Sequence, residues 1–428
     1  MKAVIVLLLA SLPVQAGLAE VTAIRGARIH TGLGSEVIEN GTVLVRDGVI
    51  EAVGVDVPVP AGARLIEAEG KQVTPGLVDG YGRLGVEEVS GESTSVDATH
   101  TGLPYSAAFD LAPAVNPHSV RIQVNRSEGI TAGVLAPGVR GDGTVMGPVF
   151  AGQAALLHLL PGDRAATQPG IGVVFPFGTA GAGLSGGSRA AAILRLREAL
   201  ADARDYRDNR RAFERGERRG YALTRLDLEA LLPVLDGRIP LLVEANREAD
   251  LRTIVEVAQS EGIRVVIVGG AEAWRAADLL ARENVPVIVD ALANLPENFD
   301  ALDATLANAA RLERAGVKVA FATSDRTNPR NVRQLAGNAV RHGMSHPAAV
   351  AAITTVPLAA LVGAGTPLGL QPGARADLVI WDGDPLEVTT LPTEVFLSGV
   401  PVGTSSRQTL LRDRYRQLGA QPPAYRGR

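Results

Sequence analysis

The chain has 428 residues, of which 46% are hydrophobic, so it can bury a large core or more than one small domain. Its formal net charge is −4, whereas a nucleic-acid-binding protein normally presents a basic face, so nucleic acid is not an expected partner. The chain contains no cysteine, which excludes structural disulfides and thiolate metal sites.

The N-terminal segment has the features of a secretory signal. A lysine follows the first methionine, Ala3–Leu12 is an apolar run too short to span a bilayer, and Val14-Gln15-Ala16 is a small-x-small cleavage site. Residues 1–19 are therefore predicted to be a signal peptide, cleaved near Gly17 or after Ala19. An uncleaved anchor or a buried first strand is the alternative. We expect an exported protein, periplasmic or secreted, with no membrane contact after cleavage.

Both ends of the mature chain are predicted to form short β-strands. Residues 20–74 contain β-rich runs such as GTVLVRDGVIEAVG, interrupted at Gly, Asp-Gly and Asn-Gly, which are hairpin signals. Residues 374–403 repeat this pattern with ARADLVIWDGDPLEV. Two strand-rich ends around a long middle predict one small β-domain built from both termini.

The middle of the chain, residues 75–373, alternates apolar strands with helical patterns. The predicted strands are GLVDGYG (76–82), ITAGVLA (130–136), IGVVFPF (171–177), IPLLVEA (239–245), IRVVIVGG (263–270), VPVIVDA (285–291) and VKVAFAT (317–323). Nearly continuous apolar strands, each followed by a helix, are typical of a parallel sheet covered on both faces. About eight such units fit, which favours an α/β fold of the (β/α)8 barrel type. On periodicity alone, a doubly wound open sheet is the alternative.

Three further segments have distinct compositions. Residues 202–229 are rich in arginine and nearly balanced by acids, which predicts a solvated helix with ion pairs rather than a nucleic-acid patch. The glycine-containing segment 138–159 is expected at the mouth of the barrel. Residues 404–428 are predicted to be a polar tail with a short helix.

Three motifs resemble the amidohydrolase superfamily, in particular its imidazolonepropionase-like and prolidase-like exported members. They are ENGTVLVRDGVIEAVG, IEAEGKQVTPGLVDG and GLQPGARADLVIWDGDPLE, in the family's order and spacing. The similarity runs from Val21 to Val402. It implies a (β/α)8 barrel with a β-sandwich built from both ends. It also implies an ancestral reaction in which zinc or another divalent metal assists hydrolysis of amide or other C–N bonds in small substrates.

The first strand departs from the family's ligand pattern. The family has His-x-His at its end, but this chain has Tyr81 and Arg83, with Asp79 retained before them. Neutral tyrosine is a poor zinc ligand and guanidinium is not a ligand. The bridging ligand in many relatives is a carboxylated lysine, and no lysine lies between Lys71 and Lys318. Some relatives use glutamate there, so that option stays open.

The fifth and sixth strands depart from the pattern too. The fifth reads VEANR where relatives have a string like IHAHR, so Glu244 and Asn246 take the histidine places and Arg247 is retained. Glu244 could bind a metal alone, weakly. The sixth strand has Gly269-Gly270 where the family has His-Gly, and glycine supplies no ligand.

The eighth strand displaces the expected general base. The family's GTDS is replaced by ATSD, so Ser324 stands at the aspartate position and Asp325 follows one residue later. A slip of one residue in a strand turns a side chain to the other face, so Asp325 stays a weak candidate. None of the six histidines forms a ligand pair at a strand end.

The sequence therefore predicts no bound metal or other cofactor. We expect the mouth to be lined by a set of candidate binding residues: Asp79, Tyr81, Arg83, Asn246, Arg247 and Ser324. Arg83 is expected to pair with Glu244 or Asp325 across the mouth, or else each charge faces solvent.

Three functions remain open. The first is a non-catalytic homologue that binds a small molecule or a partner, either as a homo-oligomer or with an intact homologue. The second is a C–N hydrolase that works without the usual metal, with Glu244, Asp325 or Asp290 as general base. The third is an ordinary metallohydrolase with unrecognised ligands.

Overall fold

The computed structural model describes residues 21–101, 103–139, 146–362 and 365–416. The predicted signal peptide and the last part of the predicted tail lie outside these described residues. Within the described ranges, no helix combines the length and the apolarity that crossing a bilayer requires.

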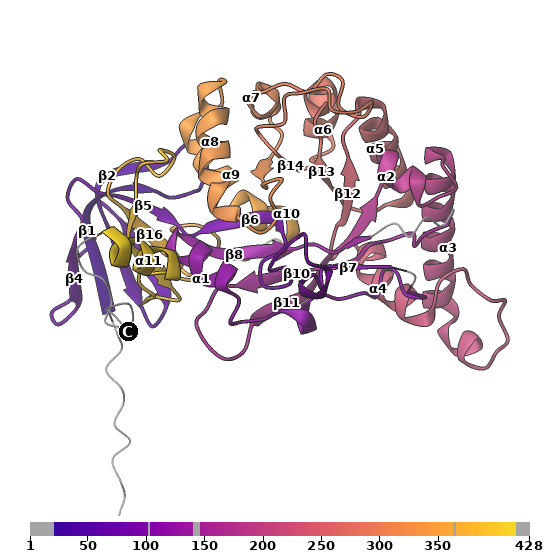
Figure 1. The fold of residues 1–428 in the computed structure, drawn as a ribbon, viewed down its shortest axis with the longest axis horizontal. Coiled ribbons are helices and arrows are strands. Elements are labelled where there is room, and N and C mark those ends of the chain that lie inside the picture. The colour runs from indigo at the N-terminus through magenta and orange to yellow at the C-terminus, as the bar shows by residue number, and fades with distance from the viewer. Residues whose placement is uncertain (1–20, 102, 140–145, 363–364, 417–428) are drawn as a thin grey trace, which may run out of the picture.

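Both ends of the chain meet in one eight-stranded sheet, drawn at the left of Figure 1. Strands from the two ends join where β16 pairs antiparallel with β5. Its buried side chains, such as Ile24, Val43 and Leu378, form a core of their own. The prediction of a β-domain built from both termini is confirmed. In spatial order the strands are β18 (Val400–Pro401), β17 (Pro392–Leu397), β16 (Leu378–Trp381), β5 (Gln72–Pro75), β1 (Val21–His30), β2 (Val37–Arg46) and β3 (Val49–Gly54), with β4 (Arg64–Glu67) pairing β1.

The middle of the chain forms a second eight-stranded sheet that curls into a nearly closed barrel. Its first and last strands approach closely, because a Cβ at Gly80 would lie only 2.6 Å from the Phe321 carbonyl oxygen. The backbone N–H of Arg83 also donates to the Arg326 carbonyl at 2.8 Å. The predicted barrel is thus confirmed. In spatial order its strands are β6 (Leu77–Gly82), β8 (Ile130–Leu135), β10 (Gly152–His158), β11 (Ala166–Pro176), β12 (Leu241–Ala245), β13 (Val265–Gly269), β14 (Val287–Val289) and β15 (Val319–Phe321).

One barrel strand differs from the predicted pattern of parallel strands. β10 pairs antiparallel with both β8 and β11. Only residues 159–165 connect β10 to β11, and a crossover between parallel strands needs a dozen residues or more. Part of segment 138–159, expected at the mouth as a whole, is therefore a barrel strand that ends at the opposite side of the barrel.

Side chains alternate between two buried layers along the barrel strands. Val78, Leu242 and Ile288 pack inside the barrel, whereas Leu241 and Val243 pack outward against the helices. This alternation points Glu244, two residues after Leu242, into the barrel. The covering helices and those near the mouth are α1 (Val120–Ser127), α2 (Gly178–Gly183), α3 (Arg189–Glu214), α4 (Arg225–Leu235), α5 (Glu248–Glu261), α6 (Ala277–Arg282), α7 (Asn308–Arg314), α8 (Val332–Arg341), α9 (His346–Ala352) and α10 (Val356–Leu361).

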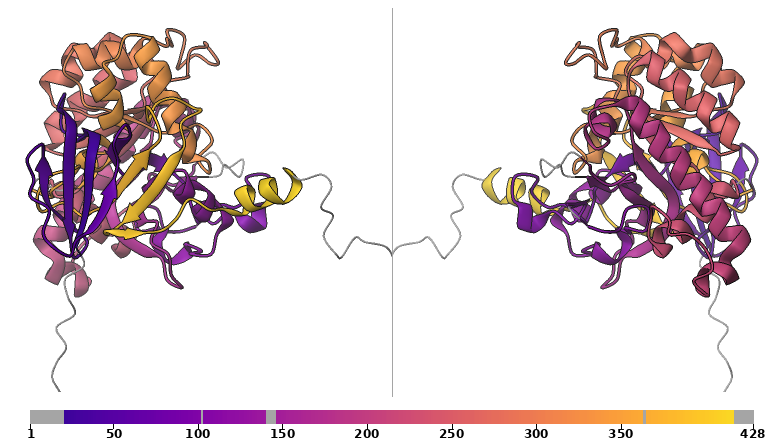
Figure 2. Two further views of the ribbon diagram at one scale, coloured as in Figure 1. Left: turned by 90° about the vertical axis from the view of Figure 1, so that its left-hand side faces the viewer. Right: turned by 90° about the vertical axis from the view of Figure 1, so that its right-hand side faces the viewer.

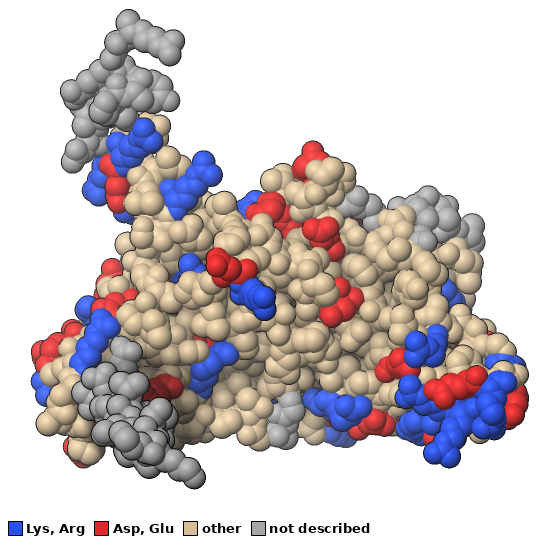
Figure 3. Space-filling view, turned by 90° about the horizontal axis from the view of Figure 1, so that it is seen from below, with Lys and Arg blue, Asp and Glu red and all other residues tan. Residues whose placement is uncertain are grey.

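The arginine-rich segment forms the end of α3, a connection and α4. Its arginines pair with nearby acids, for example Arg210 with Glu214 and Arg225 with Glu229. On the face shown in Figure 3, blue and red side chains lie intermixed. The segment is therefore the ion-paired helical surface that its composition predicts. The short helix of the tail, α11 (Arg407–Arg416), projects from the body of the molecule (Figure 2).

Candidate functional site at the barrel mouth

Tyr81 lies inside the barrel at the position of the family's first histidine. The pairing of β6 with β8 is irregular between Asp79 and Gly82, and this bulge turns Tyr81 into the interior layer. Its hydroxyl donates a hydrogen bond of 3.0 Å to Glu244 Oε1 on β12. Burial, together with the negative charge of Glu244, raises the pKa of Tyr81, so the hydroxyl remains a hydrogen-bond donor.

Arg326 completes this cluster from the segment after β15. Its Nη2 donates to Glu244 Oε1 at 3.3 Å, and its guanidinium lies over the Tyr81 ring, 4.8 Å from the centroid. Tyr81 is almost fully buried, and the side chains of Arg326 and Glu244 are 32% and 25% exposed. The positive charge beside Glu244 is therefore a fixed guanidinium that also stacks on an aromatic ring.

Asp79, two residues before Tyr81, is almost completely buried. Its Oδ1 accepts a hydrogen bond of 3.3 Å from the Tyr81 backbone N–H, but its Oδ2 has no partner among the described residues. A Cβ at Gly82 would lie 1.8 Å from that oxygen, so glycine is needed there. Burial raises the pKa of Asp79 to about 7, although the Tyr81 N–H and the charge of Arg326 act in the opposite direction.

Arg83 does not make the expected contact with Glu244 or Asp325. Its Nη1 donates to Glu87 Oε2 at 3.0 Å, four residues along the sequence, and both side chains are largely buried. β6 ends at Gly82, so the alternation that turns a strand residue inward no longer governs Arg83. Arg326 provides the positive charge that the sequence analysis assigned to Arg83.

Asn246 occupies the space beside the glycine of the sixth strand. Its Oδ1 accepts a hydrogen bond from the Ala271 backbone N–H at 3.2 Å. A Cβ at Gly269 would lie 2.5 Å from that oxygen, and Gly269 has φ +98°, a conformation that side chains rarely adopt. The family's histidine could not stand at position 269 without a local rearrangement of Asn246 and the backbone.

Arg247 belongs to a neighbouring charge network around the buried Asp250 and Asp300. Its Nη2 donates to Asp250 Oδ1 at 2.5 Å, and Arg189 Nε donates to Asp250 Oδ2 at 3.0 Å. Arg189 also pairs with Asp300, which accepts from the Thr179 backbone N–H at 2.7 Å. The network joins the first turns of α3 and α5 to the segment after β14, so Arg247 supports the walls of the mouth.

The eighth-strand residues make local contacts. Ser324 is exposed, and its backbone N–H donates to Asp290 Oδ2 at 3.2 Å. Asp325 accepts hydrogen bonds from Thr327 Oγ1 at 2.8 Å and from Asn328 Nδ2. Partial burial tends to raise the pKa of Asp325, but these hydrogen bonds outweigh it and hold the pKa below its ordinary value. Asp325, one residue beyond the aspartate position of the family motif, thus caps the turn at residues 325–328.

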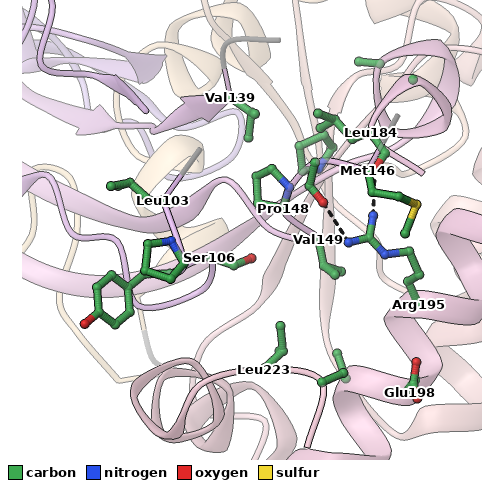
Figure 4. A pocket seen from close by; sticks show the side chains of 18 of the residues that line it. Leu103, Ser106, Val139, Met146, Pro148, Val149, Leu184, Arg195, Glu198 and Leu223 are labelled. Atoms are coloured by element: carbon green, nitrogen blue, oxygen red, sulfur yellow. Dashed lines mark hydrogen bonds between the residues drawn. The ribbon is translucent and has the colours of Figure 1, made fainter. Parts of the chain in front are cut away.

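A cavity of about 760 Å³ opens beside Glu244 at the mouth (Figure 4). Pro176 and Glu244, at the ends of adjacent strands, contribute to its lining, and segments 103–106 and 146–149 form further walls. Arg195 lies against one wall, where it donates to the carbonyls of Gly147 and Leu184 at 2.7 Å each. Of the predicted site residues, Glu244 alone is among those that line this cavity.

The cluster is a poor set of ligands for a divalent ion. Tyr81 and Arg326 both donate to Glu244 Oε1, and Arg326 places a positive charge beside this carboxylate, which opposes the binding of a cation there. Asp79 is near its pKa at neutral pH, and Gly269 has no side chain. In the described part of the chain, no group of three or more His, Asp or Glu side chains is arranged to hold a metal ion.

The chain resembles known proteins over most of its length. No protein-family model matches it. It is 25% identical over 405 aligned positions to the amidohydrolase tasK of Hapsidospora irregularis, across 84% of this chain and 39% of that protein. The chain thus spans well under half the length of this curated relative.

Solved structures share the fold. An amidohydrolase from Thermotoga maritima MSB8 superimposes with a TM-score of 0.77 at 23% identity, covering 89% of this chain and 99% of that one. A molinate hydrolase gives a TM-score of 0.55 at 17% identity, covering 96% and 99%. The class of protein is therefore an amidohydrolase-type barrel with an added sheet. The resemblance of its motifs to the amidohydrolase superfamily is thus supported by the tasK relative, and the solved structures share the fold.

Proposed function

We propose that this protein is an amidohydrolase homologue whose metal site is lost and whose barrel mouth binds a small molecule. The observation that carries the proposal is the engagement of Glu244 Oε1 by both Tyr81 and Arg326. A guanidinium beside Glu244 neutralises the carboxylate that would otherwise stand unpaired, which is the electrostatic task a cation performs in the family.

The cavity suggests the chemistry of the ligand. Its walls combine apolar side chains, such as Leu103, Val149 and Leu223, with polar ones such as Arg195 and Glu198. Both donors converge on Glu244 Oε1, which leaves Oε2 without a protein donor among the described residues. A ligand with an N–H group and an apolar body suits this arrangement, and N-acyl amino acids and dipeptides are the first compounds to screen.

Calorimetric titration of these compounds into the purified protein tests the proposal. We expect saturable binding that Glu244→Gln weakens about tenfold or more, because the variant loses the charged acceptor. Glu198→Gln is the matched control, since Glu198 also lines the cavity but is exposed. Binding that is equally strong in both variants would contradict the assignment of the ligand site.

A second candidate function is hydrolysis of labile C–N bonds with Glu244 as general base. The free Oε2 beside the cavity favours it, because a general base needs an unoccupied oxygen near the substrate. This function predicts product formation that is insensitive to chelators and is abolished by Glu244→Gln. If turnover instead stops on chelation and returns with zinc, the protein is a metallohydrolase.

We also propose export to the periplasm or outside the cell, and assembly with itself or with an intact homologue. The apolar N-terminal run and its small-x-small site support export. N-terminal sequencing of the mature protein should find a start near residue 17 or 20. Co-purification of a tagged chain from its source should recover the homologue if the heteromer exists.

A further inference from the structure

A second cavity, of about 350 Å³, lies at the end of the barrel opposite the mouth. Residues at the beginnings of β6, β8 and β11 line it, together with residues 373–375 and Asp377, which lead into β16 of the terminal sheet. None of its lining residues lines the mouth cavity. It is therefore a separate hollow, at the junction of the barrel and the sheet.

The antiparallel strand β10 brings a histidine to this cavity. His158 is the last residue of β10, and a parallel strand would have carried it to the mouth instead. Arg375 Nη2 lies 2.6 Å from His158 Nδ1. Because guanidinium can only donate, Nδ1 accepts this hydrogen bond, and the neutral imidazole carries its proton on Nε2. Burial and the charge of Arg375 lower the pKa of His158 to about 4, so the ring is neutral at physiological pH.

Arg375 is held in place by Asp377. Its Nε donates to Asp377 Oδ2 at 2.6 Å, and Asp377 Oδ1 accepts from the Ser398 backbone N–H at 2.8 Å. Two of the three guanidinium nitrogens are thus engaged. Arg375 Nη1 and His158 Nε2 have no acceptor among the described residues, although both side chains line the cavity. The cluster therefore presents N–H donors from two fixed side chains.

The other walls of the cavity combine aliphatic side chains with threonines and Gln168. The aliphatic residues and prolines are Leu156, Leu358, Val362, Leu368, Pro75 and Pro367. We propose that this cavity binds the carboxylate of a small aliphatic acid, with the two oxygens accepting from Arg375 Nη1 and His158 Nε2 and the chain packed on these walls. Arginine favours planar carboxylates because its N–H groups match their geometry.

Titration calorimetry with sodium hexanoate tests the proposal on the mature protein. We expect saturable binding, and at least about tenfold weaker binding of hexanamide and hexylamine, which lack the carboxylate. Arg375→Gln should weaken hexanoate binding about tenfold or more. Glu244→Gln should leave it unchanged, so this result is independent of the proposed function of the mouth.

Two further measurements keep the proposal testable if Arg375→Gln fails to fold. Leu358→Trp places a larger side chain in the cavity while Arg375 and His158 stay unsubstituted, and it should abolish hexanoate binding. In protein labelled with ¹⁵N-histidine, the His158 Nε2 resonance, assigned with His158→Gln, should shift on addition of hexanoate. The proposal is overturned if about 10 mM hexanoate gives no saturable signal, or if hexylamine binds as well as hexanoate.

Discussion

At the scale of single residues, the mouth holds a hydrogen-bonded guanidinium beside a carboxylate. Tyr81 and Arg326 both donate to Glu244, which stands in the fifth-strand ligand position. The sequence identified Tyr81 and Glu244 as substituted ligand positions, because the family motifs locate them. It missed Arg326, because 82 positions separate Arg326 from Glu244 and only the closure of the barrel brings them together.

A double-mutant cycle tests the partner of Glu244. Arg326→Met and Glu244→Gln should be coupled by about 1–3 kcal/mol in the free energy of unfolding, because the two side chains share one ion pair. Arg83→Met is the matched control, since Arg83 pairs with Glu87. Arg83→Met and Glu244→Gln should add to within about 0.5 kcal/mol. If Arg83→Met were coupled to Glu244→Gln instead, the Arg83–Glu244 pair expected from the sequence would be correct in solution.

The buried carboxyl of Asp79 predicts a pH dependence of stability. Its pKa is raised from 3.8 to about 7 in the folded protein, so between these values the folded state binds more protons than the unfolded state. Stability from this group is therefore complete below about pH 4 and is lost as the pH rises through about 7. At about 1.4 kcal/mol per pKa unit, the loss is roughly 4 kcal/mol.

Asp79→Asn should remove this loss, because asparagine stays neutral. We expect chemical denaturation to show that the variant gains stability relative to the wild type as the pH rises from 4 to 8. Asp325→Asn is the control with the opposite sign. The pKa of Asp325 is lowered, so its contribution to stability is present above its ordinary pKa and is lost as the pH falls. Parallel pH profiles for wild type and Asp79→Asn would refute the raised pKa.

At the scale of elements, the backbone at the end of β13 disfavours a histidine at position 269. Gly269 combines a positive φ with close contact to Asn246. Gly269→Ala should therefore destabilise the protein by at least about 1 kcal/mol more than Gly316→Ala, as measured by denaturant unfolding. Gly316 also has positive φ, +88°, but nothing lies within 4 Å of its missing Cβ. Equal losses of stability in Gly269→Ala and Gly316→Ala would mean that Asn246 moves away from the added methyl group without an energetic penalty.

The network around Arg189 predicts which elements hold the walls of the mouth. Asp250 and Asp300 are buried, and both pair with Arg189. Arg189→Met should cost about 3 kcal/mol and speed hydrogen exchange in residues 290–305, because it leaves buried carboxylates less well paired. Arg197→Met, which removes a 3.9 Å pair of a half-exposed arginine with Glu261, should cost less than about 1 kcal/mol. Similar exchange rates in the two variants would contradict this role.

The elements also show where sequence patterns failed. Apolar runs located seven barrel strands, since a strand buried on both faces leaves a continuous hydrophobic string. β10 was assigned to the mouth instead, because glycines and prolines surround it and nothing in a short apolar run encodes strand direction. That direction decides which end of the barrel receives His158.

At the scale of the whole molecule, the fold could be predicted from three motifs and one periodicity. The motifs lie at both ends of the chain, and together they predicted one terminal sheet. In the structure β5 and β16, which are far apart in sequence, pair within that sheet. The two cavities could not be predicted, since their walls come from loops and strand ends far apart in sequence. The resemblance to the amidohydrolase superfamily was thus visible in the sequence, whereas the contacts at the mouth needed the structure.

The content and affinity of divalent metal in the purified mature protein test the central claim most directly. Elemental analysis after equilibration with zinc and removal of loosely bound ions should find far less than one equivalent per chain. The same measurement on Arg326→Met shows whether the guanidinium alone blocks the site. A full equivalent of zinc in the wild type, released by a chelator and lost in Glu244→Gln, would contradict the account.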